Sequence, residues 1–344
     1  KRFRRGWRPS RRRASACRSA PARCGRAAGS LRAPDVVDLI DERGVALASA
    51  LADPAAEVCA RVFHRLPGKR FDAAAAIQRA WERRAPLHLL ATSDDQRTTC
   101  YRVVHGEADF LRVADVLIVV LLADCLAAHL DAICQALHAC LPNAIVVVRD
   151  HRDDLRVRET SSWRWQGAGI RSAIDPLASV IGHEFGVPLV IRPFAGLATG
   201  IYVDQRPTRA WLRPQARGAR VLNLFSYTGL FSISLLQAGA ASAVDVDLSA
   251  PALAQAGDNA RLAGVADRHR TMHGECRKVL SNLSEHFDRI IVDPPTSAHG
   301  EGGWILRRDY PEVLSLAWTR LAPGGVLLAV CNTVHGKPFG LSEA

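Results

Sequence analysis

The spacing of hydrophobic and polar positions changes along this chain near residue 220. Beyond that point, short apolar runs alternate with segments in which apolar residues recur at helical spacing. The runs predict five strands, over residues 221–225, 243–246, 270–273, 289–292 and 326–330. Helices are expected up to Ala238, over 250–263 and near 309–321, the last ending at the Pro-Gly-Gly of residues 323–325. This alternation is typical of an α/β domain in which helices cover both faces of a parallel sheet.

The preceding part of the chain has a less regular pattern. Two strands around an Asp-Glu-Arg-Gly turn are expected within residues 36–53, followed by a helix over 72–85. Further on, the pattern predicts a strand and a turn within 98–109, a buried strand over 116–123, one helix from Leu126 to Leu141, and a strand over 144–148. Residues 150–180 give no clear element. This order of elements indicates a smaller α+β domain before the α/β domain.

The positive charge of the chain is concentrated at its beginning. The formal net charge is +11, yet residues 1–34 hold twelve Lys or Arg and no acid, so the rest is nearly balanced, with 33 basic and 34 acidic residues. We expect this tail to be solvated and disordered. An arm that contacts nucleic acid is a second interpretation, and a transit peptide a third. Because the chain begins with Lys, we also expect that it is part of a longer sequence.

The cysteines and the apolar runs restrict the class of protein. The nine cysteines include no Cys-x-x-Cys pair, which indicates reduced thiols in a cytoplasmic protein. Cys134, His138 and Cys140 lie close together on an apolar helical pattern, so we expect packing rather than a metal site, and no metal is predicted elsewhere. The most apolar stretch, residues 114–130, is interrupted by aspartates, and no membrane-spanning segment is predicted.

Four polar features follow the first four predicted strands of the α/β domain. They are residues 226–229 (Ser-Tyr-Thr-Gly), Asp247, Glu275 and residues 293–295 (Asp-Pro-Pro). In an open parallel sheet they meet at one edge, where the ligand binds, and a carboxylate in the place of Asp247 can accept both hydroxyls of a ribose. The single glycine argues against a pyrophosphate and therefore against a Rossmann-type dehydrogenase. A ribose-containing ligand without phosphates, such as S-adenosylmethionine, fits this loop.

The order of these motifs resembles a known family. The segments that carry the resemblance are VLNLFSYTG (221–229), VDVDLS (244–249), FDRIIVDPPT (287–296), LAPGGVLLAVCNT (321–333) and, upstream, TGIYVDQRPTRAWL (199–212). Together they are similar to the class I S-adenosylmethionine-dependent methyltransferases of bacterial 23S ribosomal RNA. YRVVHGEAD (101–109) resembles the start of the central α+β domain of that family, and residues 36–54 resemble part of its RNA-binding PUA domain.

The resemblance implies roles for individual residues. The cofactor-binding residues would be Asn223, Phe225, Ser226, Thr228, Gly229, Asp247 and Glu275. Those that shape the substrate pocket beside the methyl group would be Asp293, Pro294 and Pro295. Those that brace the cofactor loop or approach RNA phosphate would be Asp204, Gln205, Arg206 and Arg209. Simpler interpretations stay open, because Asp247 and Glu275 could be helix caps and Asp293 could be only a strand terminator.

The resemblance also implies an architecture and a function. We expect a basic tail (1–34), a partial PUA-like β region (35–70), a helix with the central α+β domain (71–195), and a Rossmann-like methyltransferase domain (196–344) that is truncated at its C-terminus. The predicted activity is methyl transfer from S-adenosylmethionine to a base of large-subunit ribosomal RNA. Alternatives are a non-catalytic RNA-binding relic and a methyltransferase with another substrate. An uncovered sheet edge could pair with a second copy in a homodimer.

Cys331 decides between two chemistries. In the cytosine-5 branch of the resembling family, a cysteine after the fifth strand adds to carbon-6 of the base. Here Cys331 falls one position before the matching place, which Asn332 occupies, and one position turns a strand side chain to the other face. Asp-Pro-Pro-Thr looks more like the guanine-modifying branch. We therefore expect methylation of a nitrogen, although a bulge could return Cys331 to the pocket as a nucleophile.

Overall fold

The structure, a computed structural model, describes residues 2–4, 31–56, 58–90, 96–104, 109–152, 161–167, 169–175, 178–194, 200–298 and 303–331. The predictions for most of the basic tail, for Asn332 and for the end of the chain lie outside these residues. The chain forms two compact units, Lys1–Thr92 with Thr99–Ala178, and Ser93–Thr98 with Ser179–Ala344. The four-part division made from the sequence stays a prediction. No helix in the described segments has the length and apolarity needed to cross a membrane.

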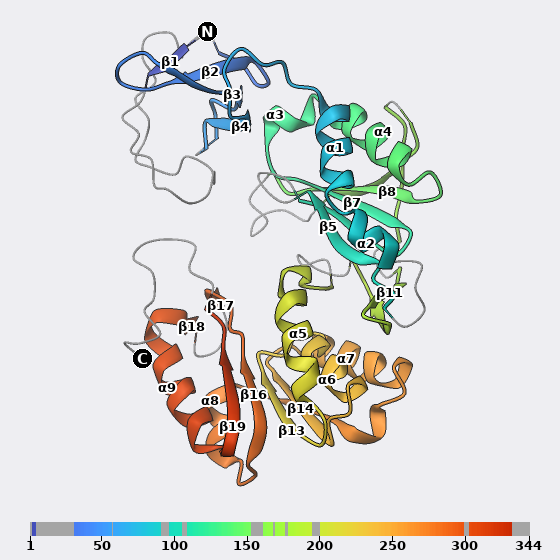
Figure 1. Cartoon of the computed structure of the whole chain (residues 1–344), viewed down its shortest axis with the longest axis vertical. Coiled ribbons are helices and arrows are strands. Elements are labelled where there is room, and N and C mark those ends of the chain that lie inside the picture. Colours follow the sequence, from blue (N-terminus) through green and yellow to red (C-terminus); the bar gives the residue numbers. More distant parts are fainter. Residues whose placement is uncertain are drawn as a thin grey trace. The chain divides into compact units, whose positions relative to one another are not determined.

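The first unit begins with a four-stranded sheet (Figure 1). Its strands, in spatial order, are β1 (Arg2–Arg4), β2 (Val36–Ile40), β3 (Ala46–Ala52) and β4 (Ala60–His64). The predicted turn between β2 and β3 is confirmed. One carboxylate oxygen of Asp41 accepts hydrogen bonds from the backbone N–H of Arg43 and of Val45 at 2.9 and 2.8 Å. Gly44 supplies the positive φ of 82° that the turn requires.

A six-stranded sheet follows in the same unit. Its strands, in spatial order, are β10 (Arg171–Ser172), β9 (Ser161–Trp165), β8 (Ile145–Asp150), β7 (Val116–Leu121), β6 (Asp109–Val113) and β5 (Cys100–Val104). The sequence pattern missed β6 because Arg112 interrupts its apolar residues. This arginine is nevertheless buried, and its guanidinium donates to the hydroxyl of Tyr101 at 3.0 Å and to the carbonyl of Ala114 at 3.0 Å. A polar residue with internal partners can thus occupy a buried strand.

The helices of the first unit differ in part from the prediction. The helix expected over 72–85 is α1 (Ala73–Glu82), with the side chain of Asp72 as its N-cap, and a separate helix α2 (Ala85–Leu90) follows. The prediction of a single helix from Leu126 to Leu141 is wrong, because this segment does not form one continuous helix. It is divided into α3 (Asp124–Ala127) and α4 (Leu130–Cys140), because His129 leaves the helical conformation at φ −106° and ψ 6°.

The second unit contains a hairpin and a parallel five-stranded sheet. The hairpin, which the sequence did not predict, consists of β11 (Val180–Glu184) and β12 (Val187–Ile191). The sheet consists, in spatial order, of β15 (His269–His273), β14 (Ser242–Asp247), β13 (Arg220–Leu224), β16 (Phe287–Val292) and β19 (Leu321–Ala329). All neighbouring strands in it are parallel. The five predicted strands and the parallel sheet are therefore confirmed.

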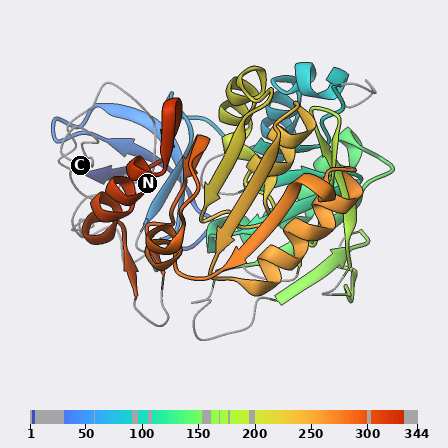
Figure 2. The same ribbon diagram turned by 90° about the horizontal axis from the view of Figure 1, so that it is seen from below.

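Helices cover both faces of this sheet, as the pattern predicted (Figures 1 and 2). They are α5 (Arg206–Leu212), α6 (Leu230–Gln237), α7 (Ala250–Leu262), α8 (Cys276–Asn282) and α9 (Leu306–Thr319). Leu222 and Leu224 pack with the buried residues of α8 and α9 in one core. The alternate positions of β13, Val221 and Asn223, are buried as well. Because successive strand residues point to opposite faces, β13 is enclosed on both sides.

One boundary near the end of the sheet was predicted incorrectly. Pro323, Gly324 and Gly325 do not end the helix, because α9 ends at Thr319 and these three residues lie within β19. Phe287 of β16 pairs with Leu321 of β19, and the next pair is Arg289 with Val326. Between these two pairs the chain advances by two residues in β16 and by five in β19. The extra residues form an irregularity where proline and a positive-φ glycine are tolerated, and Gly324 has a φ of 75°.

Candidate functional site

A cavity of about 670 Å³ opens at the carboxyl ends of the strands of the second unit. The predicted site residues that line it are Asn223, Phe225, Ser226, Thr228, Asp247, Glu275, Asp293, Pro294, Pro295, Cys331, Asp204, Gln205 and Arg209. Two predicted residues, Gly229 and Arg206, are not part of the lining. The fold thus gathers at one cavity motifs that are spread along residues 204–331 of the sequence.

The loop between β13 and α6 has an unusual backbone. Phe225, Tyr227 and Gly229 all have a positive φ, at 57°, 51° and 74°. A positive φ is strained for the two aromatic residues, and such strain is concentrated at functional sites. At Gly229 an added Cβ would lie 2.4 Å from a carboxylate oxygen of Asp245 and 2.8 Å from Cβ of Ala256. The single glycine is therefore required by close packing beneath the loop.

Ser226 contributes an available polar group to the cavity. Its side chain is buried, and its Oγ has no hydrogen-bond partner among the described residues. Buried hydroxyl groups are almost always hydrogen-bonded, so an unpaired one in a cavity wall indicates that a ligand or water completes it. This observation supports the prediction that the loop binds a ligand.

Asp247 and Glu275 have different local roles. The two oxygens of Asp247 accept the backbone N–H groups of Tyr227 and Ser249, each at 2.8 Å. The N-cap of α7 is Ser249, so the cap interpretation of Asp247 is wrong. Glu275, in contrast, is the N-cap of α8, where it accepts the backbone N–H of Lys278 at 3.2 Å while also lining the cavity. Its capping role and its place at the cavity coexist.

A buried carboxylate that the sequence analysis missed supports the loop from below. Asp245, on β14, is fully buried. It accepts hydrogen bonds from the amide nitrogen of Asn223 at 2.8 Å and from the hydroxyl of Ser232 at 2.5 Å, and its other oxygen lies 2.7 Å from Nε2 of His269. The alternating pattern of β14 could not indicate this role, because a buried Asp at an apolar strand position shows its partners only in the fold.

Arg209 is a structural brace in the cavity wall. Its side chain is only 2% exposed and makes a double hydrogen bond with Glu184, at 2.6 and 2.8 Å. It also donates to the backbone carbonyl of Tyr202 at 3.0 Å. The guanidinium has no exposure that would suit an RNA phosphate. Of the two roles expected for Arg209, its contacts support the brace, and Glu184 on the hairpin is the partner that the sequence did not reveal.

Asp293 lies in an electrostatic environment that alters its protonation. Burial and the negative charge of Asp204 raise the pKa of Asp293 to about 6, against the opposing effect of Arg209. The pKa of Tyr202 is also raised, by burial and by the charges of Asp204, Asp293 and Asp247. Carboxyl groups that titrate near neutral pH inside a cavity are typical of sites that exchange hydrogen bonds or protons with a ligand.

Residues from α9 and from the short strand before it hold the segments that follow β16 and β19. The indole N–H of Trp304, on β18 (Trp304–Ile305), donates to the carbonyl of Pro295 at 2.7 Å. The Trp304 ring packs on Phe225, with ring centroids 4.8 Å apart. The hydroxyl of Tyr310 donates to the carbonyl of Val330 at 2.7 Å. No signal in the sequence separated Trp304 and Tyr310 from ordinary core aromatic residues.

Cys331 is found in the cavity wall. The strand alternation used to place it no longer applies, because β19 ends at Ala329 and Cys331 lies beyond it. The expectation that it faces away from the pocket is therefore wrong. Burial raises the pKa of its thiol, against the opposing effect of Arg307.

Comparisons with known proteins agree with this geometry. A family model described as S-adenosylmethionine-dependent methyltransferase matches residues 95–344. The ribosomal RNA large subunit methyltransferase I of Photobacterium profundum is 30% identical over 305 residues, which cover 86% of this chain and 75% of the relative. The ribosomal RNA large subunit methyltransferase K/L of Pseudomonas fluorescens is 34% identical over 201 residues, which cover 58% of this chain and 25% of the relative.

Two solved structures show the same fold. SMU.776, in complex with SAH, superposes with a TM-score of 0.72 at 22% identity, over 87% of this chain and 78% of that chain. The SAM-dependent methyltransferase from Agrobacterium tumefaciens gives a TM-score of 0.51 at 22% identity, over 69% and 73%. The Rossmann-like fold class predicted from the sequence is confirmed. From the family match and the shared length, the chain belongs to the S-adenosylmethionine-dependent methyltransferases.

Proposed function

We propose that this chain transfers a methyl group from S-adenosylmethionine to a base of large-subunit ribosomal RNA. The observation that carries the proposal is that one cavity joins two kinds of wall. On one side of β13 lies Asp247, at the end of β14, and on the other lies the Asp-Pro-Pro segment after β16. The names of the two relatives support ribosomal RNA as the substrate.

The cofactor side of the cavity fits S-adenosylmethionine. Asp247 is held by two backbone N–H groups and keeps lone pairs for the ribose hydroxyls. The unpaired hydroxyl of Ser226 suits the amino-acid end of the cofactor, with Asn223, Phe225 and Thr228 beside it. The bound cofactor supplies an electrophilic methyl group, and the chain's contribution is to hold donor and acceptor in line.

The other side of the cavity fits a flat base taken out of the RNA stack. Asp293 can accept a hydrogen bond from an N–H group of the base, and Trp304 fixes the backbone of the adjoining Pro295. Such a substrate is met in the cytoplasm, and the cysteine pattern of the sequence predicts the same location. Whether the enzyme works as a monomer or a homodimer, and whether residues 1–34 contact RNA, remain predictions from the sequence.

Within this proposal we favour a nitrogen of the base as the methylated atom. The raised pKa of Cys331 keeps its thiol protonated, and a protonated thiol is a poor nucleophile. A ring nitrogen or amine can attack the methyl group without a covalent adduct with the enzyme.

The proposal is tested by methyl transfer from labelled S-adenosylmethionine to ribosomal RNA that lacks the modification. We expect label in large-subunit RNA and none in small-subunit RNA. A chain that binds the cofactor but labels no RNA would indicate another substrate. A chain that binds RNA but not the cofactor would be the non-catalytic relic.

A further inference from the structure

Arg277 belongs to the part of the cavity wall that follows β15 in the chain. It is in the first turn of α8, which follows β15, and it lines the cavity with Glu275. The loop of residues 226–229 follows β13 and Asp247 ends β14, so a ligand with its tail at the loop and its ribose at Asp247 directs its base toward β15 and α8. For S-adenosylmethionine that base is adenine.

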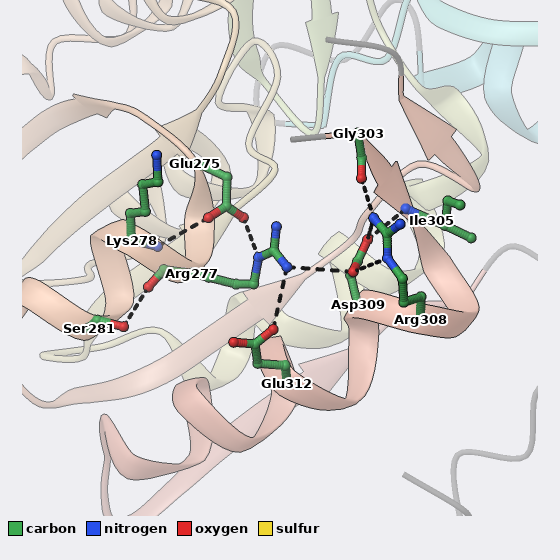
Figure 3. Close-up of polar contacts among 9 residues, drawn as sticks. All are labelled: Glu275, Arg277, Lys278, Ser281, Gly303, Ile305, Arg308, Asp309 and Glu312. Atoms are coloured by element: carbon green, nitrogen blue, oxygen red, sulfur yellow. Dashed lines mark hydrogen bonds and ion pairs between the residues drawn. The ribbon is translucent and has the colours of Figure 1, made fainter. Parts of the chain in front are cut away.

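Three carboxylates hold the Arg277 guanidinium in one orientation (Figure 3). Its Nε donates to Oε1 of Glu275 at 2.9 Å, and its Nη1 lies 3.5 Å from Oδ1 of Asp309 and 3.4 Å from Oε2 of Glu312. Asp309 is itself buried and accepts the backbone N–H of Ile305 at 2.7 Å. Because the guanidinium is planar, these contacts also fix the direction of the third nitrogen.

The third nitrogen of Arg277 is available to a ligand. Nη2 donates to no other residue in the described part of the chain, and Figure 3 shows it pointing away from Glu312. The hydrogen bond with Glu275 raises the pKa of Arg277, so the group stays charged. A charged donor and the Glu275 carboxylate therefore stand side by side in the cavity wall.

This donor and acceptor pair is complementary to adenine. Adenine presents an amino donor next to a ring-nitrogen acceptor, either N1 or N7. Guanine and hypoxanthine carry an oxygen in place of the amino group, and the carboxylate would repel it. We propose that Arg277 is a specificity-determining residue for the cofactor, donating Nη2–H to the adenine ring nitrogen adjacent to the amino group that Glu275 accepts. The inference concerns the cofactor alone and does not depend on ribosomal RNA as the substrate.

Calorimetric titration of the full chain tests the contact without any assay of activity. The ligands are S-adenosylhomocysteine, its 1-deaza and 7-deaza analogues, and S-inosylhomocysteine. We expect one deaza analogue to bind about tenfold to a hundredfold more weakly, since a hydrogen bond from a charged donor is lost, and the other to bind nearly as well as the parent ligand. The inosine analogue should also bind weakly. Equal affinity for all four ligands would overturn the proposal, and this arm requires no variant.

The variants identify the residue responsible. Arg277→Gln should weaken the binding of S-adenosylhomocysteine by the same factor. The variant should then bind S-adenosylhomocysteine and the sensitive deaza analogue with similar affinity. Lys278→Gln is the matched control, because it removes the same charge from the neighbouring, exposed position of α8. It should leave all affinities unchanged. If Arg277→Gln weakens every ligand equally, or weakens none, Arg277 only neutralises the surrounding carboxylates and the proposal fails.

Discussion

The two walls of the cavity are built in different ways. The cofactor wall comes from short segments that directly follow β13, β14 and β15, and its main contacts join neighbouring strand ends, as when Asp247 accepts the backbone N–H of Tyr227. The wall around Asp293 depends on residues farther along the chain, since Trp304 and Tyr310 hold the segments after β16 and β19. The first wall is therefore specified by segments at strand ends, and the second also by side chains of β18 and α9.

The largest expected effect concerns the packing under the cofactor loop. Gly229→Ala should destabilise the chain by about 2–4 kcal/mol, because the new Cβ would collide with Asp245 and Ala256 at a positive φ of 74°. The measurement is urea unfolding. Gly264→Ala is the control, since Gly264 has a similar φ of 66° and no atom within 4 Å of the added Cβ. Equal losses in the two variants would show that the collision with Asp245 is unimportant.

The difference between the walls explains how much the sequence could predict. The loop, Asp247 and Asp293 follow strand ends, so the order of strands was enough to bring them together. Asp245, Glu184 and Trp304 were missed because each acts through a specific partner that no pattern in the sequence links to it, namely His269, Arg209 and Pro295. The hairpin β11–β12 was missed for another reason, because it follows a segment without a clear pattern.

Asp247→Ala should have the next largest effect, on cofactor affinity. Without the carboxylate, the ribose hydroxyls lose their acceptor, and two backbone N–H groups lose theirs. We expect binding of S-adenosylhomocysteine to weaken by about 1–3 kcal/mol in calorimetry. Asp247→Asn keeps one acceptor oxygen and should lose less. Unchanged affinity in a folded Asp247→Ala variant would show that Asp247 does not bind the cofactor.

Trp304→Phe tests the other wall. It removes the hydrogen bond to the Pro295 carbonyl and keeps most of the packing against Phe225. We expect a loss of about 0.5–1.5 kcal/mol in transition-state stabilisation, measured as a lower kcat for methyl transfer, with unchanged affinity for S-adenosylhomocysteine. If cofactor affinity falls as much as kcat, the two walls are not independent.

The pH dependence of methyl transfer should report Asp293. Its pKa of about 6 means that the carboxylate becomes protonated as the pH falls through that value and can no longer act only as an acceptor. Transfer should therefore decline below about pH 6. Asp204→Asn removes a negative charge that raises this pKa, so the decline should move to lower pH. A pH profile that is the same in the parent and in Asp204→Asn would show that Asp293 is not the group whose titration controls methyl transfer.

The smallest expected effect concerns Cys331. Its thiol lines the cavity but has a raised pKa, and the chemistry that we favour requires no covalent adduct. Cys331→Ala should therefore retain methyl transfer to RNA, and RNA that contains 5-fluorocytosine should not become covalently attached to the parent enzyme. Cytosine-5 methylation, in contrast, requires a covalent adduct with a cysteine, because carbon-5 becomes nucleophilic only after a thiolate adds to carbon-6. Loss of transfer in a folded Cys331→Ala variant, together with a trapped adduct in the parent, would identify Cys331 as the nucleophile. The Asp293 wall would then hold a cytosine for covalent catalysis.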